Sequence, residues 1–556
     1  MSPFDQGVVY THRFLDLLKL RGLESSEAAE SFLRADLDSL LDPFRMKGMR
    51  EACLRIHTAV RNGEGILIHG DYDVDGITGA SIVAKTLKLM GVEPRIFLPN
   101  RSEDGYGVSE RAIREAKQNG ESLLITVDCG VAAASKIALA RDLGLDVIIV
   151  DHHRIPADGL PPANFILNPL QSDCDYPFKD LSAGGLAFKL SQALLGERAY
   201  EFLDLAAVST VCDVAPLREE NRVLVRKGLK LLTQKINLGF RALSEVAKLG
   251  SRDINVGHIG FAFGPRINAA GRMSSPEIAL RLLLTQSPRE AESLAKILEE
   301  ENKARQREER QTVKEAIREV ERTMNFSRDR VIVVGREGWH QGVIGIVASR
   351  LVDRFHRPAI VIAFEEGKGK GSGRSIKAFN LYEGLCDSKE LFLEFGGHAQ
   401  AAGLSIMADK IDAFRIKINE FARSRMRPED MIKTVPVDME LKLEELTTPF
   451  LKELEMLEPH GAGNPRPVFM SRDLHMKTQP VRLTPQTTQF YVTDGAYVYE
   501  AQWTEKLRGE GFGDEEDPIK ALQKGKRFDL SYSLKIKSWE GRERVVLEAK
   551  EIKPQL

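Results

Sequence analysis

Short apolar runs alternate with amphipathic stretches through the first part of the chain. The runs are rich in Ile, Val and Leu, whereas the stretches between them place apolar residues at helical spacing. Apolar, β-branched strands that alternate with helices indicate a parallel sheet covered by helices on both faces. The predicted strands are 65–71, 94–100, 122–128 and 145–151, and the predicted helices are 77–91, 109–120 and 134–144.

The pattern changes after about residue 285. Residues 287–324 form a long, highly charged stretch without Gly, and its single Pro lies at the start. Such a stretch is typical of a solvated helix with charge pairs four residues apart, so we predict a helical connector. A second α/β unit follows over 330–425, and the short alternating strands beyond about residue 433 predict a small barrel or sandwich.

These patterns divide the chain of 556 residues into several domains, because one hydrophobic core rarely grows beyond roughly 250–300 residues. The predicted parts are a helical leader (1–62), an α/β domain (63–285), a connector helix (286–327), a second α/β domain (328–428) and a β-rich domain (433–556). The acidic, Gly-rich insert at 508–518 is predicted to be a flexible loop.

Composition narrows the class of protein only slightly. The net charge of −2 decides nothing, because metal-binding carboxylates would offset a basic groove. Five scattered cysteines without a CxxC pair argue against a disulfide framework. No apolar run approaches the roughly 20 residues that span a bilayer, and residues 1–14 lack a signal-peptide pattern. We therefore expect a cytoplasmic protein without membrane contact.

Acidic residues and histidines stand where the predicted strands end. They are His69, Asp71, Asp73, Asp75, Asp128, Asp151, His152, His153 and, after a later apolar run, Asp213. In open α/β sheets, ligands bind beyond the carboxyl ends of the strands. Carboxylates held close together repel one another unless they are protonated or share a cation. Oxygen and imidazole ligands suit Mn, Mg or Zn, so the sequence predicts a metal site at this edge.

Simpler explanations account for single residues but not for the set. An Asp after a strand is commonly a helix cap, and a His pair is more often structural than metal-bound. The sequence D-x-D-x-D-G also opens the calcium loop of an EF-hand, which needs a Glu at its twelfth position. Counting from Asp71, the twelfth residue is Ile82, and the segment follows a strand, which excludes an EF-hand.

Taken together, the motifs resemble those of the DHH phosphoesterase superfamily. HGDYDVDG, TVDCG, DHH and the segment around Asp213 occur in the order of that superfamily. The resemblance continues through FGPRINAAGRM (263–273), HQGVIGIVASRL (340–351), KGSGRSI (370–376) and FGGHAQAAGLSI (395–406), and the last three resemble the DHH-associated domain. LEPHGAGNPRPVF (457–469) and the leader at 21–43 are similar to the RecJ family, although His460 stands where an aromatic residue is expected.

This resemblance implies a parallel-sheet DHH catalytic domain, a long connecting helix, a second α/β DHH-associated domain and a C-terminal β-barrel of the OB-fold type. It also implies two divalent metal ions, Mn²⁺ or Mg²⁺, that activate water and neutralise charge on the phosphate. The implied ligands are His69, Asp73 and Asp128 for one ion and Asp75, Asp128, His152 and Asp213 for the other. Asp71 is either a partner of these ligands or a turn residue. The implied catalytic residues are His153, Asp128 and Arg272.

The activity implied by the resemblance is a 5′→3′ exonuclease that hydrolyses single-stranded DNA to 5′-mononucleotides in DNA recombination and repair. Arg side chains and Gly-exposed N–H groups suit phosphate, and by resemblance Arg101, Ser372 and Arg374 clamp the 5′-phosphate. The other implied substrate-binding residues are Arg266, Asn268 and His398. A single-strand binding protein and a RecQ-type helicase are implied partners, and we expect a monomer.

Two alternatives stay open. An oligoribonuclease or cyclic-dinucleotide phosphodiesterase would use the same centre, but such relatives are usually shorter and lack the connector and terminal barrel. A catalytically silent replication scaffold would have lost metal ligands, whereas every expected position is filled here. Aromatic and basic residues of the predicted barrel, such as Tyr497 and Trp503, favour a polymer substrate. No motif separates DNA from RNA.

Overall fold

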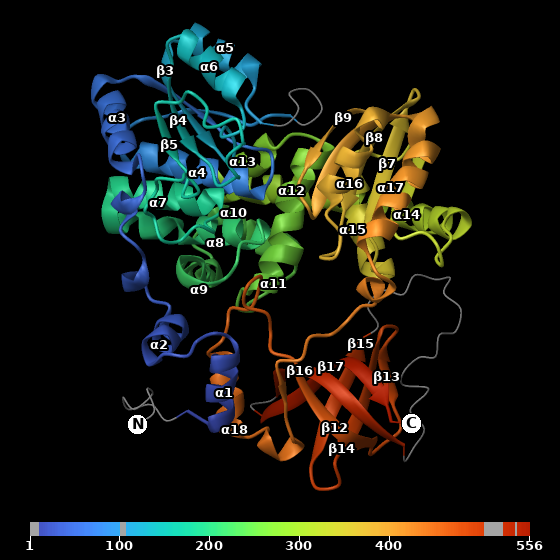
Figure 1. Ribbon diagram of the computed structural model, residues 1–556. Coiled ribbons are helices and arrows are strands. Elements are labelled where there is room, and N and C mark those ends of the chain that lie inside the picture. Colours follow the sequence, from blue (N-terminus) through green and yellow to red (C-terminus); the bar gives the residue numbers. More distant parts are fainter. Residues whose placement is uncertain (1–9, 101–106, 505–525, 540–541, 556) are drawn as a thin grey trace. The chain divides into compact units, whose positions relative to one another are not determined.

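The computed structural model describes residues 10–100, 107–504, 526–539 and 542–555. Arg101 and the acidic insert at 508–518 lie outside these ranges. The chain forms two compact units (Figure 1). The first contains residues 1–302 and Thr448–Arg466, and the second contains Lys303–Thr447 and Pro467–Leu556. In the described part of the chain, no helix combines the length and apolar character needed to cross a bilayer.

The N-terminal unit is built on a parallel sheet, as the strand–helix alternation predicts. Its strand order is β2-β1-β3-β4-β5, and all neighbouring strands are parallel. The strands are β1 (Gly65–His69), β2 (Arg95–Phe97), β3 (Glu121–Val127), β4 (Asp146–Val150) and β5 (Phe165–Leu167). The parallel arrangement places the carboxyl ends of β1, β3 and β4 along one edge, which is where the candidate ligands follow.

Helices cover both faces of this sheet, which explains why its strands are apolar throughout. Residues of α5 (Glu110–Gln118) and α6 (Ala134–Asp142) pack with Leu67 and Leu124 on one face. Residues of α3 (Met49–Asn62), α4 (Val74–Leu89), α7 (Ala183–Leu195) and α8 (Leu203–Cys212) pack with Ile68 and Ile125 on the other. Figure 1 shows the two layers of helices on opposite sides of the strands.

Further helices extend the second of these layers. They are η3 (Gly196–Phe202), α9 (Glu219–Gln234), α10 (Leu238–Val246), α11 (Val256–His258), the π-helix η4 (Ile259–Phe263), α12 (Gly264–Met273) and α13 (Glu277–Leu284). The leader contributes α1 (His12–Leu20), α2 (Ser26–Arg34), η1 (Leu37–Ser39) and η2 (Pro43–Arg45), as its helical spacing predicts.

A distant segment, Thr448–Arg466, completes the N-terminal unit and contains α18 (Thr448–Glu455). The buried Arg222 of α9 holds it. Its guanidinium donates to the carbonyls of Met456 at 3.0 Å, Leu457 at 2.9 Å and Glu458 at 2.8 Å. The same group donates to the carbonyl of Phe32 at 2.7 Å and lies 3.9 Å from the centre of that ring. One side chain thus joins leader, α9 and this late segment.

The same segment also supports the loop that follows Asp213. The N–H of Leu217 donates to the carbonyl of Ala462 at 2.7 Å, and Nε of Arg218 donates to the carbonyl of Gly463 at 3.0 Å. A Cβ on Gly463 would lie 2.7 Å from that of Pro216. The close approach explains the need for glycine at this position.

The C-terminal unit begins within α14 (Pro288–Thr323), the predicted connector helix. A mixed sheet follows, with the strand order β6-β7-β8-β10-β9 and one parallel pair, β6 with β7. Its strands are β6 (Ile332–Glu337), β7 (Ala359–Glu365), β8 (Lys368–Arg374), β9 (Phe392–Gly397) and β10 (Ala401–Met407). Its helices are α15 (Ile344–Phe355), α16 (Leu381–Asp387) and α17 (Ile411–Arg425), with short turns η5 (Lys389–Leu391), η6 (Ala408–Lys410) and η7 (Pro428–Met431).

The last sheet contains the short strands predicted beyond residue 433. They are β11 (Met439–Glu440), β12 (Phe469–Met476), β13 (Val481–Thr484), β14 (Thr487–Thr493), β15 (Val498–Thr504), β16 (Arg527–Trp539) and β17 (Arg542–Pro554), with η8 (Leu443–Glu445) between β11 and β12. Because β12 pairs with both β16 and β14, the pairings run in a ring through β12, β16, β17, β15 and β14. The closed barrel and the predicted domain boundaries stay predictions.

Candidate metal centre and phosphate site

The acidic loop between β1 and α4 is shaped by a tight turn. Asp73 caps α4, because its Oδ1 accepts from the N–H groups of Asp75 at 2.9 Å and Gly76 at 3.2 Å. A Cβ on Gly76 would lie 2.5 Å from the nitrogen of Asp71, so only glycine fits there. This turn brings Asp71, Asp73 and Asp75 to one edge of the sheet.

Asp75 is fixed from the neighbouring helices. Its carboxylate accepts from the N–H groups of Ala183 at 2.9 Å and Gly184 at 2.8 Å, at the N-terminus of α7. The hydroxyl of Ser209 donates to the same carboxylate. Unpaired N–H groups at a helix N-terminus favour a negative charge, so the fold holds Asp75 in one orientation.

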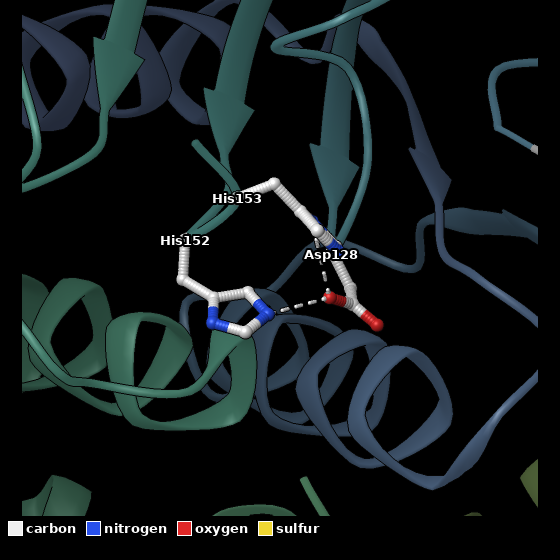
Figure 2. A group of neighbouring side chains, drawn as sticks. All are labelled: Asp128, His152 and His153. Atoms are coloured by element: carbon white, nitrogen blue, oxygen red, sulfur yellow. Dashed lines mark ion pairs between the residues drawn. The ribbon is translucent and has the colours of Figure 1, made fainter. Parts of the chain in front are cut away.

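The ends of β3, β4 and α8 bring the other candidate ligands to this point. Asp128 follows β3 in the left-handed region, with φ of 65°, and Asp213 follows α8. His152 Nε2 lies 3.3 Å from Asp128 Oδ1 and 3.6 Å from Asp75 Oδ2, while its Nδ1 lies 3.7 Å from Asp213 Oδ2. Figure 2 shows that His152 and His153 both approach Asp128. The side chains therefore converge from separate elements.

Asp151 positions the second histidine. Its Oδ1 lies 2.7 Å from His153 Nδ1 and accepts from the N–H of His153 at 3.1 Å. Burial alone would lower the pKa of His153, but its hydrogen bond to Asp151 and the surrounding carboxylates raise that pKa to about 9. Burial opposes ionisation of Asp151, yet His153 keeps the pKa of that carboxyl below its ordinary value. The pair is therefore ionised at neutral pH.

The remaining carboxyls are crowded and buried. Burial and the charge of Asp73 raise the pKa of Asp71 to about 7, and burial with the charges of Asp75 and Asp73 raises that of Asp213 to about 8. Burial and the charge of Asp75 raise the pKa of Asp73, and burial with the charges of Asp75 and Asp73 raises that of Asp128. Oδ1 of Asp71 and Oδ1 of Asp128 are buried and accept no hydrogen bond from the described residues. A divalent cation would satisfy both oxygens and relieve the repulsion.

Among the described residues, three groups of side chains lie close enough to hold a metal ion. They are Asp71, Asp73 and Asp128; Asp75, His152 and Asp213; and Asp128, His152 and His153. Within each group the candidate ligand atoms lie within 4.8 Å of one another. Asp128 belongs to two groups, which suits a ligand shared by two cations.

His69 is the predicted ligand that these groups leave out. It is buried, its Nε2 accepts from the N–H of Ser109 at 3.0 Å, and its Nδ1 lies 3.7 Å from the sulfur of Cys129. Binding a metal through Nε2 would require the loss of the hydrogen bond from Ser109. The assignment of His69 as a ligand stays a prediction.

Helix α12 supports the acidic loop from outside the sheet. Oδ1 of Asn268 accepts from the N–H of Val74 at 3.2 Å, and a Cβ on Gly271 would lie 2.5 Å from the carbonyl oxygen of Tyr72. Asn268 therefore positions the loop, and its contact with the substrate stays a prediction. Arg266 forms an ion pair with Glu299 at 2.7 Å and donates to the carbonyl of Ala262. Arg272 lies on α12 and is half-buried.

In the C-terminal unit, Ser372 and Arg374 lie on the same face of β8. Nη1 of Arg374 donates to the hydroxyl of Ser372 at 3.2 Å. A Cβ on Gly345, in the first turn of α15, would lie 3.0 Å from the Ser372 hydroxyl and 3.2 Å from Nη2 of Arg374. A guanidinium, a hydroxyl and a helix N-terminus thus meet, which suits a phosphate group. His398 is exposed in the turn after β9.

Three family models match this chain. They describe the N-terminal domain of the DHH family over residues 65–210, the DHHA1 domain over 328–424 and the RecJ OB domain over 437–551. The single-stranded-DNA-specific exonuclease RecJ of Escherichia coli is 35% identical over 488 residues, which are 83% of each chain. The chain belongs to the RecJ family.

Other proteins of the RecJ family are also similar to this chain. The Bacillus subtilis exonuclease RecJ is 43% identical over 456 residues, and this chain spans 57% of its length. The crystal structure of RecJ in complex with Mn²⁺ from Thermus thermophilus has a TM-score of 0.81 and 29% identity, and covers 97% of this chain and 76% of its own. The crystal structure of RecJ in complex with Mg²⁺ from Thermus thermophilus has a TM-score of 0.76 and 28% identity. It covers 98% of this chain and 75% of its own.

Two acidic residues lie in this centre besides the predicted ligands. Asp71 joins a metal-capable group, and Asp151 orients His153. The first signal was present in the D-x-D-x-D spacing and the second in the DHH motif itself. What the sequence did not show is that Asp71 is buried with an unsatisfied oxygen.

Metal binding to this RecJ-family protein is expected to strengthen as the pH rises from 6 to 9. The raised pKa of Asp71, about 7, and of Asp213, about 8, mean that protons must leave before a cation binds. Affinity for Mg²⁺ should rise by up to about tenfold per pH unit for each proton displaced. Calorimetric titration in buffers of different ionisation enthalpy measures both affinity and proton release.

The thermal stability of the metal-free protein should change in the opposite direction. The folded chain holds these protons more tightly than the unfolded chain does. The folded protein therefore loses stability as the pH rises from about 4 to about 8 and these carboxyls ionise. The gain in Tm from Mg²⁺, measured against NaCl at equal ionic strength, should widen over the same range. A gain that is flat between pH 6 and 9 would contradict the assignment of these carboxyls as ligands.

Proposed function

We propose that this chain degrades single-stranded DNA in the 5′→3′ direction and releases 5′-mononucleotides, with two divalent cations, Mn²⁺ or Mg²⁺, as cofactors. Membership of the RecJ family supplies the class of activity, a metal-dependent exonuclease on single-stranded DNA. The observation that carries the catalytic part is the convergence of buried carboxylates and histidines at the strand ends, with Asp128 common to two groups.

The ligand sets of the proposal follow this convergence. One ion is assigned to Asp73 and Asp128 with His69, and Asp71 is an additional candidate. The other is assigned to Asp75, Asp128, His152 and Asp213. When bound, the two cations supply Lewis-acid stabilisation of the charge that develops on the phosphate.

The protein's own groups orient the reactants. His153 is held in its charged form by Asp151 and can donate from Nε2 to a phosphate oxygen. Burial of Asp128 and Asp75 excludes water from the ligand side of the centre. Asn268 and the N-terminus of α7 fix the acidic loop before the substrate arrives, which lowers the cost of organising the site. Arg272 is kept as a proposed catalytic residue.

The 5′→3′ direction rests on the proposed phosphate site. Ser372, Arg374 and the N-terminus of α15 would bind the terminal 5′-phosphate, with Arg101 as a further proposed contact. Arg266 and His398 are kept as proposed substrate contacts. We propose that the protein acts in the cytoplasm as a monomer and takes part in DNA recombination and repair. Its proposed partners are a single-strand binding protein and a RecQ-type helicase.

The direct test is cleavage of an internally labelled single-stranded DNA in Mn²⁺, beside duplex DNA, RNA and a cyclic dinucleotide. Mononucleotides should appear progressively from the 5′ end of single-stranded DNA alone. Cleavage of only short RNA or cyclic dinucleotides would replace the proposal with that alternative. Cleavage of none of them would favour a silent scaffold.

Arg374→Ala is expected to weaken the preference for 5′-phosphorylated ends by about tenfold to a hundredfold, because it removes a charged hydrogen-bond donor from the proposed site. The ratio of kcat/KM for 5′-phosphate and 5′-hydroxyl strands measures the effect. Lys377→Ala, which removes an exposed cation three residues away, is the control. An equal loss on both kinds of end would remove the proposed role of Arg374.

A further inference from the structure

In the second half of α14, exposed basic residues lie on one side of the helix and buried residues on the other. Between residues 302 and 320 the exposed side chains are Lys303, Arg307, Arg310, Gln311, Lys314 and Arg318. The buried ones are Asn302, Arg305, Glu309, Thr312, Ala316 and Val320. Both sets recur every three or four residues, so each lies on one side of the helix. The exposed side carries no acidic residue.

Two acidic residues of this half, Glu309 and Glu315, make hydrogen bonds to neighbouring side chains. Glu309 is buried and accepts from Nη1 of Arg305 at 2.7 Å. Glu315 is half-buried, accepts from the indole of Trp339 at 2.9 Å and lies 3.3 Å from Arg336. Glu309 therefore lies on the domain side of the helix, whereas Glu315 also accepts from the amide of the exposed Gln311 at 3.2 Å and lies at the border of the two sides.

Four cations of this side form no ion pair with a carboxylate of the described residues, although the charge of Arg318 acts on Glu315. Nearby, Glu319 pairs with Arg322, and Glu308 is half-buried. We term the four cations without an ion pair in the described ranges the basic stripe. The basic stripe consists of Arg307, Arg310, Lys314 and Arg318. A surface hollow is lined by three of these side chains together with Gln311 and Glu315. The stripe is therefore a concentrated positive surface.

We propose that the basic stripe binds the sugar–phosphate backbone of the single-stranded DNA substrate. This inference rests on the proposed function and adds a contact surface outside the metal centre and the proposed 5′-phosphate site. With a helix rise of about 1.5 Å per residue, successive cations three or four residues apart are spaced by about 4.5–6 Å. That spacing is comparable with the distance between successive phosphates in an extended single strand.

The composition of the stripe favours a nucleic acid over an acidic protein. Interfaces between proteins usually contain buried aromatic or apolar anchors. The exposed positions of this half of α14 include none. Interfaces with nucleic acids are polar and strongly positive, and contacts to the backbone need no sequence-specific group. The binding should accordingly be independent of base sequence.

The test compares two triple variants of the full-length protein. Arg310→Gln/Lys314→Gln/Arg318→Gln removes three cations of the stripe. Arg61→Gln/Arg252→Gln/Arg289→Gln removes three exposed cations elsewhere. Dissociation constants are measured in EDTA over a range of salt concentrations, for a long oligo(dT) strand and for a five-nucleotide strand. Cleavage of the short 5′-phosphorylated strand is measured in Mn²⁺.

The stripe variant should bind the long strand at least tenfold more weakly at low salt. Its slope of log affinity against log salt should fall by about 2, because each phosphate contact on a single strand contributes roughly 0.7. Binding and cleavage of the short strand should match those of the wild type.

An unchanged salt slope on the long strand would overturn the proposal and would favour an acidic protein as the occupant. The same loss in the control variant would overturn it as well, because net charge would then explain the effect. Failure of the proposed function is a separate result, seen as absence of DNA cleavage by the wild type, and it leaves the salt slope measurable.

Discussion

Asp128→Asn is expected to lower the rate of DNA cleavage on the order of a thousandfold, which corresponds to about 4 kcal/mol of transition-state stabilisation. Asp128 is buried, lies 3.3 Å from His152 and belongs to two of the metal-capable groups. Asparagine keeps the shape of the side chain but removes the charge that both cations would share. Single-turnover cleavage of single-stranded DNA in Mn²⁺ measures the loss.

The same variant should be no less stable than the wild type when metal is absent. Burial and the repulsion of the neighbouring carboxylates raise the pKa of Asp128, and a neutral amide avoids both the cost of burying a charge and that repulsion. Asp204→Asn is the matched control, since it neutralises another buried aspartate of the same unit, on α8. Near-normal cleavage by Asp128→Asn, or an equal loss in the control, would refute the role of Asp128.

Arg222→Met is expected to lower the free energy of unfolding of the N-terminal unit by about 3–5 kcal/mol, because it leaves buried carbonyl groups without a donor. Methionine keeps much of the volume but cannot donate to Phe32, Met456, Leu457 or Glu458. Urea unfolding, followed by circular dichroism, measures the change.

Lys230→Met supplies the comparison for this variant. It places a methionine at an exposed position of the same helix, α9. This substitution should change the free energy of unfolding by less than about 0.5 kcal/mol. If Arg222→Met proved as mild as Lys230→Met, the guanidinium would not hold the segment after α18.

The sequence predicted the site best where periodicity alone determines geometry. Strands of a parallel sheet end at one edge, so Asp128 and His152 could be placed together from the apolar runs that precede them. The hydrogen bond from Ser109 to His69 joins residues 40 positions apart and depends on how α5 packs, which no local pattern reveals. The role of Asn268 as a support for the acidic loop was likewise hidden, because it lies 194 positions from Val74.

The connector helix shows a different limit. Its mixed charges predict a solvated helix with pairs along its surface, and pairs such as Arg305 with Glu309 exist. Which charges face solvent depends on the side that packs against α15 and the sheet, through Ala316 and Val320. That side buries Glu309 with Arg305 and leaves the stripe exposed. Helical periodicity gives the faces, but only tertiary packing tells which face is outside.

The hold of Arg222 on residues 456–458 has a consequence for biosynthesis. The ribosome releases the N-terminus first, so α9 emerges more than 200 residues before the carbonyl groups that its arginine needs. Until residues 456–458 have been synthesised, the guanidinium of Arg222 lacks these hydrogen-bond acceptors, and the loop after Asp213 lacks its contacts with Ala462 and Gly463. We therefore expect nascent chains that stop near residue 430 to bind chaperones and to resist proteases poorly, whereas chains that extend past Arg466 should acquire a protected N-terminal unit.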